Sequence, residues 1–251
     1  MIRRIHHAGI VVERLATAYE FYRNVLGLPL LREADIADQG VRAALLSAGD
    51  SEIELLEPTR AGTGVARFLE KRGEGLHHVC FDTPDVGGQL KDLAGRGIEL
   101  IDRAPRPGLA GSIAFLHPKA CDGVLVELAT PPATDEGDEH ASLRLKRLVI
   151  GAHHPATTSA RFQELFGFPE VAINSGPRSM LAVGRGALLI VPAEEVGGSE
   201  GMVALSLVAD DFFGLVQRFD EARVKAMRGT GEVTVEPESS HGVHLHISRY
   251  E

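Results

Sequence analysis

The sequence contains little cysteine: Cys80 and Cys121 are its only two cysteines among 251 residues. Two cysteines are too few for a disulfide framework, and their spacing is not the Cys-x-x-Cys of zinc and redox sites. We expect both to be free thiols. The chemistry of the protein therefore has to come from other side chains.

The sequence also lacks a long uninterrupted apolar run. No stretch approaches the roughly 20 apolar residues that a membrane-spanning helix needs. The N-terminus includes Arg3 and Arg4, but it reaches Glu13 and Arg14 before the apolar core of a signal peptide could form. We therefore expect a cytoplasmic protein without a membrane partner.

Positive charge is scarce as well, because 26 Lys and Arg residues face 35 Asp and Glu residues, for a net charge of −9. The basic clusters at residues 103–106 and 144–147 are too short for the phosphate-binding footprint of a nucleic-acid-binding protein. Hydrophobic residues make up 44% of the chain, which is enough for a buried core. We expect a folded protein with a small-molecule ligand and no nucleic-acid partner.

Composition favours a division of the chain near residue 140. Residues 131–140 contain two prolines and four acidic residues and show no apolar periodicity, as is typical of a solvated linker. The length of the chain also fits two medium-sized domains. We predict domains over residues 1–132 and 143–251, joined by a linker over residues 133–142.

The first predicted domain repeats one order of elements, a strand, a helix and further strands. The first copy has strands at residues 5–12, 40–47 and 52–56 and a helix at 13–26; the second has strands at 76–81, 113–116 and 123–128 and a helix at 85–93. His7 and Gly27 correspond to His78 and Gly97 at nearly the same spacing. The second domain repeats the order more loosely, with strands at 145–150, 187–191, 203–208 and 242–248 and two helices. The sequence thus predicts four such modules in an α+β fold.

Two histidines and two glutamates occupy matching positions in the first two copies. Because side chains alternate between the faces of a strand, each residue can be assigned to a face. His7 and His78 lie opposite the apolar residues of the first strand in each copy, and Glu54 and Glu127 do so on the last strand. Polar residues on exposed strand faces are the alternative explanation, but the match between two copies favours a site.

This donor set suits one divalent metal ion. Two imidazoles and two carboxylates leave room for two waters or substrate oxygens in six-coordination. Imidazole together with carboxylate favours cobalt, manganese, nickel, iron or zinc over calcium.

Five short segments carry a family resemblance: Ile5-His6-His7-Ala8, Glu52-Ile53-Glu54-Leu55-Leu56-Glu57-Pro58, Gly75-Leu76-His77-His78-Val79, Phe115-Leu116-His117-Pro118-Lys119 and Gly123-Val124-Leu125-Val126-Glu127-Leu128. They resemble methylmalonyl-CoA epimerase of the vicinal-oxygen-chelate superfamily, which also contains glyoxalases, bleomycin resistance proteins and dioxygenases. The last two segments are the most specific. The resemblance covers about residues 1–132.

The resemblance implies two glyoxalase-like domains, each a cupped mixed sheet of paired βαβββ modules with helices outside. It implies His7, Glu54, His78 and Glu127 as the metal ligands and an acyl-CoA thioester as the substrate. Removal of the proton beside the thioester carbonyl would leave an enolate that the metal stabilises. Glu127 would be one catalytic proton carrier, and the second is unnamed, because Ala43 stands where some relatives have Glu.

Lys119 follows Pro118 in a predicted loop, where its ammonium could bind a coenzyme A phosphate or a substrate carboxylate. A solvated loop lysine is the alternative. We expect the neighbouring His117 to make a turn contact and not a metal bond.

The second half does not repeat the ligand set. The four ligand positions map onto Arg147, an apolar residue among 188–190, Ala204 and His246. We interpret this half as a degenerate copy that packs on the first as a partner subunit would, giving a pseudo-dimer within one chain; further homodimerisation stays open. A separate metal site is the rival interpretation, built from His244 and His246 with His241, His153 and His154.

The sequence predicts a metal-dependent epimerase, and two other classes stay open. Within the same fold, a glyoxalase-type lyase or isomerase or a ring-cleaving dioxygenase uses similar residues. A fourth protein ligand disfavours the dioxygenase, which needs open positions on its metal. From a different class, a non-catalytic protein that binds a small molecule and confers resistance would need a pocket without a metal.

Overall fold

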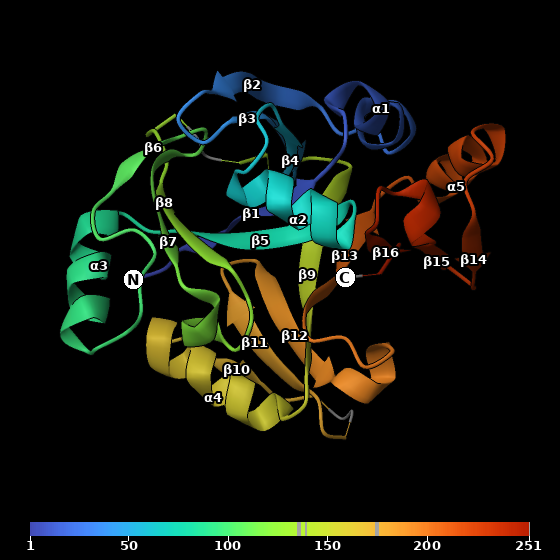
Figure 1. The fold of residues 1–251 in the computed structure, drawn as a ribbon. Coiled ribbons are helices and arrows are strands. Elements are labelled where there is room, and N and C mark those ends of the chain that lie inside the picture. Colours follow the sequence, from blue (N-terminus) through green and yellow to red (C-terminus); the bar gives the residue numbers. More distant parts are fainter. Residues whose placement is uncertain (135–136, 139, 174–175, 251) are drawn as a thin grey trace. The chain divides into compact units, whose positions relative to one another are not determined.

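The computed structural model describes residues 1–134, 137–138, 140–173 and 176–250. Within them the chain forms two mixed sheets of eight strands each, with helices on their outer sides (Figure 1). The first sheet has the order β2-β3-β4-β1-β5-β8-β7-β6, and the second has the order β10-β11-β12-β9-β13-β16-β15-β14. The predicted fold class, two cupped sheets built from four βαβββ modules, is confirmed.

The first sheet contains two modules. Its strands are β1 (Arg4–Val11), β2 (Leu30–Ile36), β3 (Val41–Ala48), β4 (Ser51–Pro58), β5 (Gly75–Asp82), β6 (Arg106–Gly108), β7 (Gly111–Leu116) and β8 (Val126–Thr130). β8 pairs in parallel with β5 and antiparallel with β7. The last predicted strand starts too early, because residues 123–125 precede β8. β2 was not predicted, since it is largely exposed and shows no apolar alternation.

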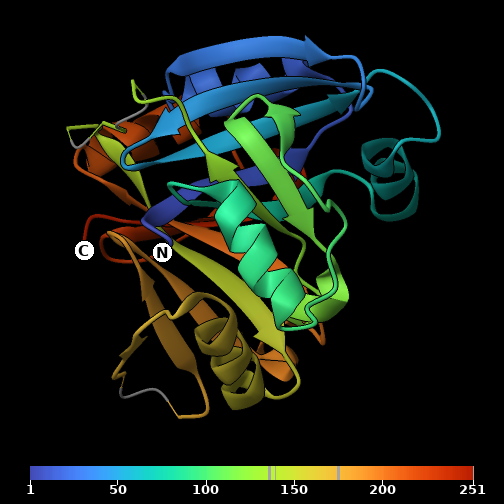
Figure 2. The same cartoon turned by 90° about the vertical axis from the view of Figure 1, so that its left-hand side faces the viewer.

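The helices of the first half cover these strands. They are α1 (Leu15–Tyr19), the π-helix η1 (Glu20–Val25), α2 (Gly64–Arg72), α3 (Val86–Gly95) and the 3-10 turn η2 (Pro118–Cys121). The predicted helix over residues 13–26 is therefore split, and in its second part the N–H of Leu26 donates to the carbonyl of Phe21. This widened turn places both Phe21 and Tyr22 in the core. α3 lies along β7 and β8 (Figure 2).

The second half repeats this arrangement. Its strands are β9 (Leu143–Ala152), β10 (Glu170–Val171), β11 (Ser179–Val183), β12 (Gly186–Pro192), β13 (Gly201–Ala209), β14 (Ala226–Arg228), β15 (Glu232–Val235) and β16 (His244–Ser248), and its helices are α4 (Pro155–Phe166), η3 (Ala193–Val196), α5 (Phe212–Glu221) and η4 (Pro237–Ser239). The strand predicted over residues 242–248 starts two residues later than expected, at His244.

Local sequence explains where the helices begin and end. Asp85 caps α3 by accepting from the N–H of Gly88 at 2.9 Å, and Asp211 caps α5 in the same way with Gly214 at 3.0 Å. Gly167 ends α4 with a left-handed φ of 74°, a conformation that other residues adopt only at a cost. These caps fix the helix that follows the first strand of a module.

The described residues form two compact units, and each takes a module from both halves of the chain. The first unit contains Met1–His7, His78–Glu136 and Arg147–Val203; the second contains Ala8–His77, Gly137–Lys146 and Ala204–Glu251. In the first unit, the Arg161 guanidinium donates to the carbonyl of Ala120 at 2.9 Å. In the second, the buried Tyr22 hydroxyl donates to the carbonyl of Ser240 at 2.9 Å. Residues of the C-terminal half thus pack against the N-terminal half within each unit.

The predicted linker is only partly described. Asp135, Glu136 and Glu139 lie outside the described residues. The N–H of Asp138 donates to the carbonyl of Gly49 at 2.8 Å, so this point of the linker is attached to the first half. The domain limits at residues 132 and 143 remain a prediction. Among the residues placed by the structure, no helix combines the length and apolar character needed to span a membrane.

Candidate metal centre

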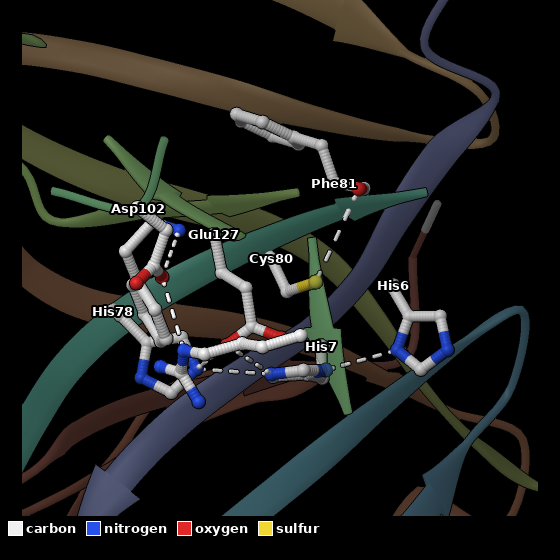
Figure 3. Close-up of polar contacts among 9 residues, drawn as sticks. His6, His7, His78, Cys80, Phe81, Asp102 and Glu127 are labelled. Carbon is white, nitrogen blue, oxygen red and sulfur yellow. Dashed lines mark hydrogen bonds and ion pairs between the residues drawn. The ribbon is translucent and has the colours of Figure 1, made fainter. Parts of the chain in front are cut away.

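Two of the predicted ligands, His7 and His78, face each other from neighbouring strands. His7 lies on β1 and His78 on β5, which are adjacent in the first sheet. Their Nε2 atoms are 2.9 Å apart, and their rings are nearly perpendicular, at 85° (Figure 3). The two histidines are 71 residues apart because each lies on the first strand of its module.

Glu127 reaches the same point from β8. In the parallel pairing of β5 with β8, Glu127 lies beside Cys80, and Cys80 shares a strand face with His78 because the two are two residues apart. Its Oε2 atom lies 3.2 Å from Nε2 of His78 and 3.9 Å from Nε2 of His7. The carboxylate thus converges on the two imidazoles (Figure 3).

Glu54, the fourth predicted ligand, lies on β4, the strand next to β1 in the sheet. Glu54 is 5% exposed, so a polar partner has to replace its lost hydration.

All four of these side chains are buried. His7 and His78 are at most 1% exposed, and Glu127 is 3% exposed. The alternative of polar residues on exposed strand faces is therefore wrong. Burying a carboxylate and two imidazoles is costly unless they are paired or bind a metal ion. The burial makes the cluster a candidate functional site.

The donor set fits a divalent transition-metal ion. With bonds of about 2.1 Å to an imidazole nitrogen, neighbouring ligand atoms around one ion lie about 3 Å apart. The 2.9 Å between the two Nε2 atoms and the 3.2 Å from His78 to Glu127 match that spacing. Imidazole and carboxylate together suit manganese, iron, cobalt, nickel or zinc.

A third histidine, His6, stands behind His7 and was not predicted as part of the site. Its Nδ1 lies 2.9 Å from Nδ1 of His7, the ring nitrogen that points away from His78 (Figure 3). Histidine ligands of metals are commonly oriented by such a contact on the other ring nitrogen. His6 is fully buried. The only sign of this role in the sequence is that His6 directly precedes His7.

One wall of the site is formed by Phe115 on β7. Phe115 is the direct antiparallel partner of Glu127, and the centroid of its ring lies 5.3 Å from that of His78. Its backbone N–H donates to Asp102 Oδ2 at 2.9 Å. The sequence analysis used Phe115 only as part of a family segment.

The other residues that the sequence singled out lie in different local settings. Lys119 is exposed in η2, and none of the described residues is assigned as a partner of its ammonium group. His117 accepts from the N–H of Lys119 through Nδ1 at 3.2 Å, which confirms the predicted turn contact. Ala43 is fully buried on β3.

Both cysteines are buried thiols, as predicted. Burial raises the pKa of the Cys121 thiol to about 12. A thiol with such a pKa is a poor nucleophile near neutral pH, because the thiolate is the reactive form. The Cys121 thiol is therefore not a nucleophile near neutral pH.

In the second sheet the corresponding positions carry other residues. Ala204 pairs with His244, and Ser206 pairs with His246, in the register that joins β5 to β8 in the first sheet. His246 makes an exposed contact with Glu232 at 3.2 Å. Among the described residues, no group of three metal-binding side chains includes any of the histidines proposed for the rival site, His153, His154, His241, His244 and His246.

Comparison with known proteins places the first half in a known group. The family model for the glyoxalase/bleomycin resistance protein/dioxygenase superfamily matches residues 6–116. The ethylmalonyl-CoA/methylmalonyl-CoA epimerase of Cereibacter sphaeroides is 37% identical over 131 residues, which are 51% of this chain and 98% of that protein. The relative therefore corresponds to the first half alone.

Two solved structures resemble this chain, one over about half of it and the other over nearly all of it. The methylmalonyl-CoA epimerase of Streptomyces coelicolor in complex with 2-nitronate-propionyl-CoA is 41% identical, with a TM-score of 0.52 over 53% of this chain and 100% of that chain. A 4-hydroxymandelate synthase from the same organism matches 98% of this chain and 92% of its own with a TM-score of 0.74, at 17% identity, which shows the fold alone. The chain belongs to the glyoxalase/bleomycin resistance protein/dioxygenase superfamily.

Proposed function

We propose that the protein is a metal-dependent epimerase that acts at the α-carbon of an acyl-CoA thioester such as methylmalonyl-CoA. The observation that carries the proposal is the buried convergence of His7, His78 and Glu127 in the half that aligns with acyl-CoA epimerases. The first half corresponds to nearly the full length of the Cereibacter enzyme, so it has the extent of a complete catalytic unit.

We assign the metal to His7, His78, Glu127 and Glu54. A bound divalent ion would act as a Lewis acid and stabilise the negative charge that develops on the thioester oxygen, an effect worth several kcal/mol. The buried setting of the four ligands excludes bulk water, which strengthens this interaction.

Glu127 is the residue that we propose for proton transfer. Its carboxylate would take the proton from the α-carbon, and the electron pair of the broken C–H bond would pass into the enolate. Return of a proton to the opposite face of the carbon then gives the other epimer. This return needs a second carrier, which Ala43 cannot be, because its methyl group holds no exchangeable proton.

We assign two further roles. The exposed ammonium of Lys119 would bind a phosphate of coenzyme A as a mobile point charge. The domain over residues 143–251 would take the place of a second subunit, consistent with the contacts of Ala120 with Arg161 and of Tyr22 with Ser240.

A ring-cleaving dioxygenase is the second candidate, and one observation favours it. His7, His78 and Glu127 are the two histidines and one carboxylate that hold iron in many oxygenases. Oxygen consumption by the iron-loaded protein with a phenolic substrate would favour this candidate over the epimerase.

Proton exchange followed by NMR tests the proposal. The metal-loaded protein is incubated in D₂O with methylmalonyl-CoA, beside a chelator-treated sample and the His78→Ala variant. We expect deuterium to appear at the α-carbon only with the loaded wild-type protein. Absence of uptake while one metal ion is bound per chain would leave the site in place but contradict the epimerase.

A further inference from the structure

Arg106 lies on the site face of the first sheet, in a position that no step of the proposed reaction uses. In the antiparallel register of β6 with β7 it lies opposite Ile113. Ile113 and Phe115 share a face because they are two residues apart, and Phe115 lies opposite Glu127. Directly opposed residues of antiparallel strands point to the same side of a sheet. Arg106 therefore belongs to the same face as Glu127.

The guanidinium of Arg106 is held in place by two neighbours. Its Nε donates to Asp102 Oδ2 at 3.2 Å, and the same oxygen accepts from the N–H of Phe115. The guanidinium carbon lies 5.5 Å from the centroid of the Phe115 ring, in cation–π range. The ring of His78 also contacts the ring of Phe115, with centroids 5.3 Å apart. Dashed lines in Figure 3 mark the two hydrogen bonds that Asp102 accepts.

One end of this guanidinium has no partner. Nη1 of Arg106 is buried and makes no hydrogen bond with any part of the chain that the structure describes. A buried N–H of a charged group without an acceptor is costly, and an anionic ligand would relieve that cost. Arginine suits a carboxylate or a phosphate well, because its planar guanidinium presents donors in a fixed geometry.

We infer that Arg106 binds the free carboxylate of the substrate and thereby selects carboxyacyl-CoA thioesters over simple acyl-CoA thioesters. The inference rests on the proposed function for the identity of the substrate. The carboxylate is favoured over a coenzyme A phosphate because Arg106 and the proposed metal ligand His78 contact the same ring, Phe115, which places Arg106 near the reacting end of the ligand. The phosphates lie at the far end of the pantetheine arm.

A comparison of two ligands in three proteins tests this inference. Methylmalonyl-CoA carries the carboxylate, and propionyl-CoA lacks it but is otherwise the same thioester. Binding of each is measured by titration calorimetry to the wild-type protein, to Arg106→Met and to Arg103→Met. Arg103 is the matched control, because it is an exposed arginine of the same segment and its loss changes the net charge equally.

We expect Arg106→Met to weaken methylmalonyl-CoA binding by about tenfold to a hundredfold, the usual range for a charged hydrogen bond. Propionyl-CoA binding should stay unchanged, and Arg103→Met should match the wild type with both ligands. An equal loss for both ligands would contradict the inference and point to a phosphate contact or to a disturbed pocket. The inference would also be overturned if Arg106→Met bound methylmalonyl-CoA in preference to propionyl-CoA as strongly as the wild type does.

A second variant, Arg106→Lys, tests the inference even if Arg106→Met does not fold. Arg106→Lys keeps the positive charge but loses the planar fork, so we expect it to fold and to show an intermediate preference for methylmalonyl-CoA. Deuterium uptake with no selective loss in Arg106→Met would overturn only this inference. Selective binding without deuterium uptake would overturn only the epimerase. A wild-type protein without preference between the two thioesters would overturn the inference in either case.

Discussion

The two sheets of the molecule have the same strand order, but only the first carries a cluster of potential metal ligands among the described residues. His78 in the first sheet corresponds to Ala204 in the second, and Glu127 corresponds to His246, because both pairs occupy equal places in matching strand registers. The topology therefore does not depend on the ligands. The function of this fold resides in a few side chains that the sheet presents.

Burial differs between the sheets in the same way. The side chain of Glu127 is 5% exposed, whereas that of His246 is 39% exposed. An exposed imidazole beside Glu232 keeps its hydration and needs no metal ion. A buried carboxylate between two imidazoles does need a compensating partner. The comparison shows that burial of the ligand positions, in addition to their identity, distinguishes the first sheet.

The largest effect should come from the loss of His78. We expect His78→Ala to abolish metal binding and to reduce epimerase activity by about a thousandfold or more, since the charge stabilisation of several kcal/mol is lost. His246→Ala, the matched change in the second sheet, should retain full activity. Equal losses of metal binding and activity in the two variants would show that the two sheets do not differ in this way.

Glu127→Gln sharpens the contrast by keeping the shape of the side chain and removing its basicity. We expect kcat to fall by about a hundredfold to ten-thousandfold, the range for loss of a general base. Deuterium uptake by NMR measures the effect. Glu99→Gln is the control, because Glu99 is exposed. An exchange rate in Glu127→Gln equal to that of the wild type would show that another residue removes the proton.

A smaller effect is expected from His6, which contacts His7 from behind. We expect His6→Ala to weaken metal affinity by about tenfold to a hundredfold, as for other residues that orient a histidine ligand. Competition with a chromophoric chelator measures the affinity. His77→Ala is the control, because His77 precedes His78 as His6 precedes His7, and its ring packs against that of Phe68. Equal affinities in wild type and His6→Ala would show that the contact does not orient His7.

The smallest effect concerns stability and the contact between the halves in the second compact unit. Burial raises the pKa of Glu74, but hydrogen bonds with His241 and the N–H of Glu13 lower it more, so the net pKa is below its usual value. A carboxyl group whose folded pKa is lowered stabilises the protein above its unfolded pKa, and this contribution is lost as the pH falls through the folded pKa.

Glu74→Gln tests this contribution. After allowance for solvent screening, we expect it to reduce the free energy of unfolding by about 1 kcal/mol at neutral pH. The difference from wild type should vanish well below the usual glutamate pKa of about 4.3. Urea unfolding at several pH values measures it, with the exposed Glu70→Gln as the control. A difference that persists unchanged in acid would show that the charge of Glu74 is not its cause.

The sequence predicted the modules and most of the site because both depend on local periodicity. The alternation of β1 and β5 placed His7 and His78 on equivalent faces, and the structure brings their Nε2 atoms together. The exposed strand β2 escaped prediction, because its charged residues give no apolar pattern. The limits of β8 also differed, since the apolar residues 124–125 continue the pattern without joining the strand.

The roles of Arg106 and His6 could not be predicted from the sequence for a different reason. The partners of Arg106, Asp102 and Phe115, are brought to it by the pairing of β6 with β7, which local periodicity does not specify. His6 lies on the opposite parity from His7, so alternation assigned it to the other face. The contact between their Nδ1 atoms depends on ring orientation, which a strand pattern does not encode.

Metal stoichiometry tests the central claim, that the site resides in the first sheet alone. Metal-free protein is loaded with cobalt, dialysed and analysed for metal per chain, as wild type, His78→Ala and His246→Ala. The account predicts one ion in the wild type, none in His78→Ala and one in His246→Ala. Retention of one ion in His78→Ala, or its loss in His246→Ala, would contradict it.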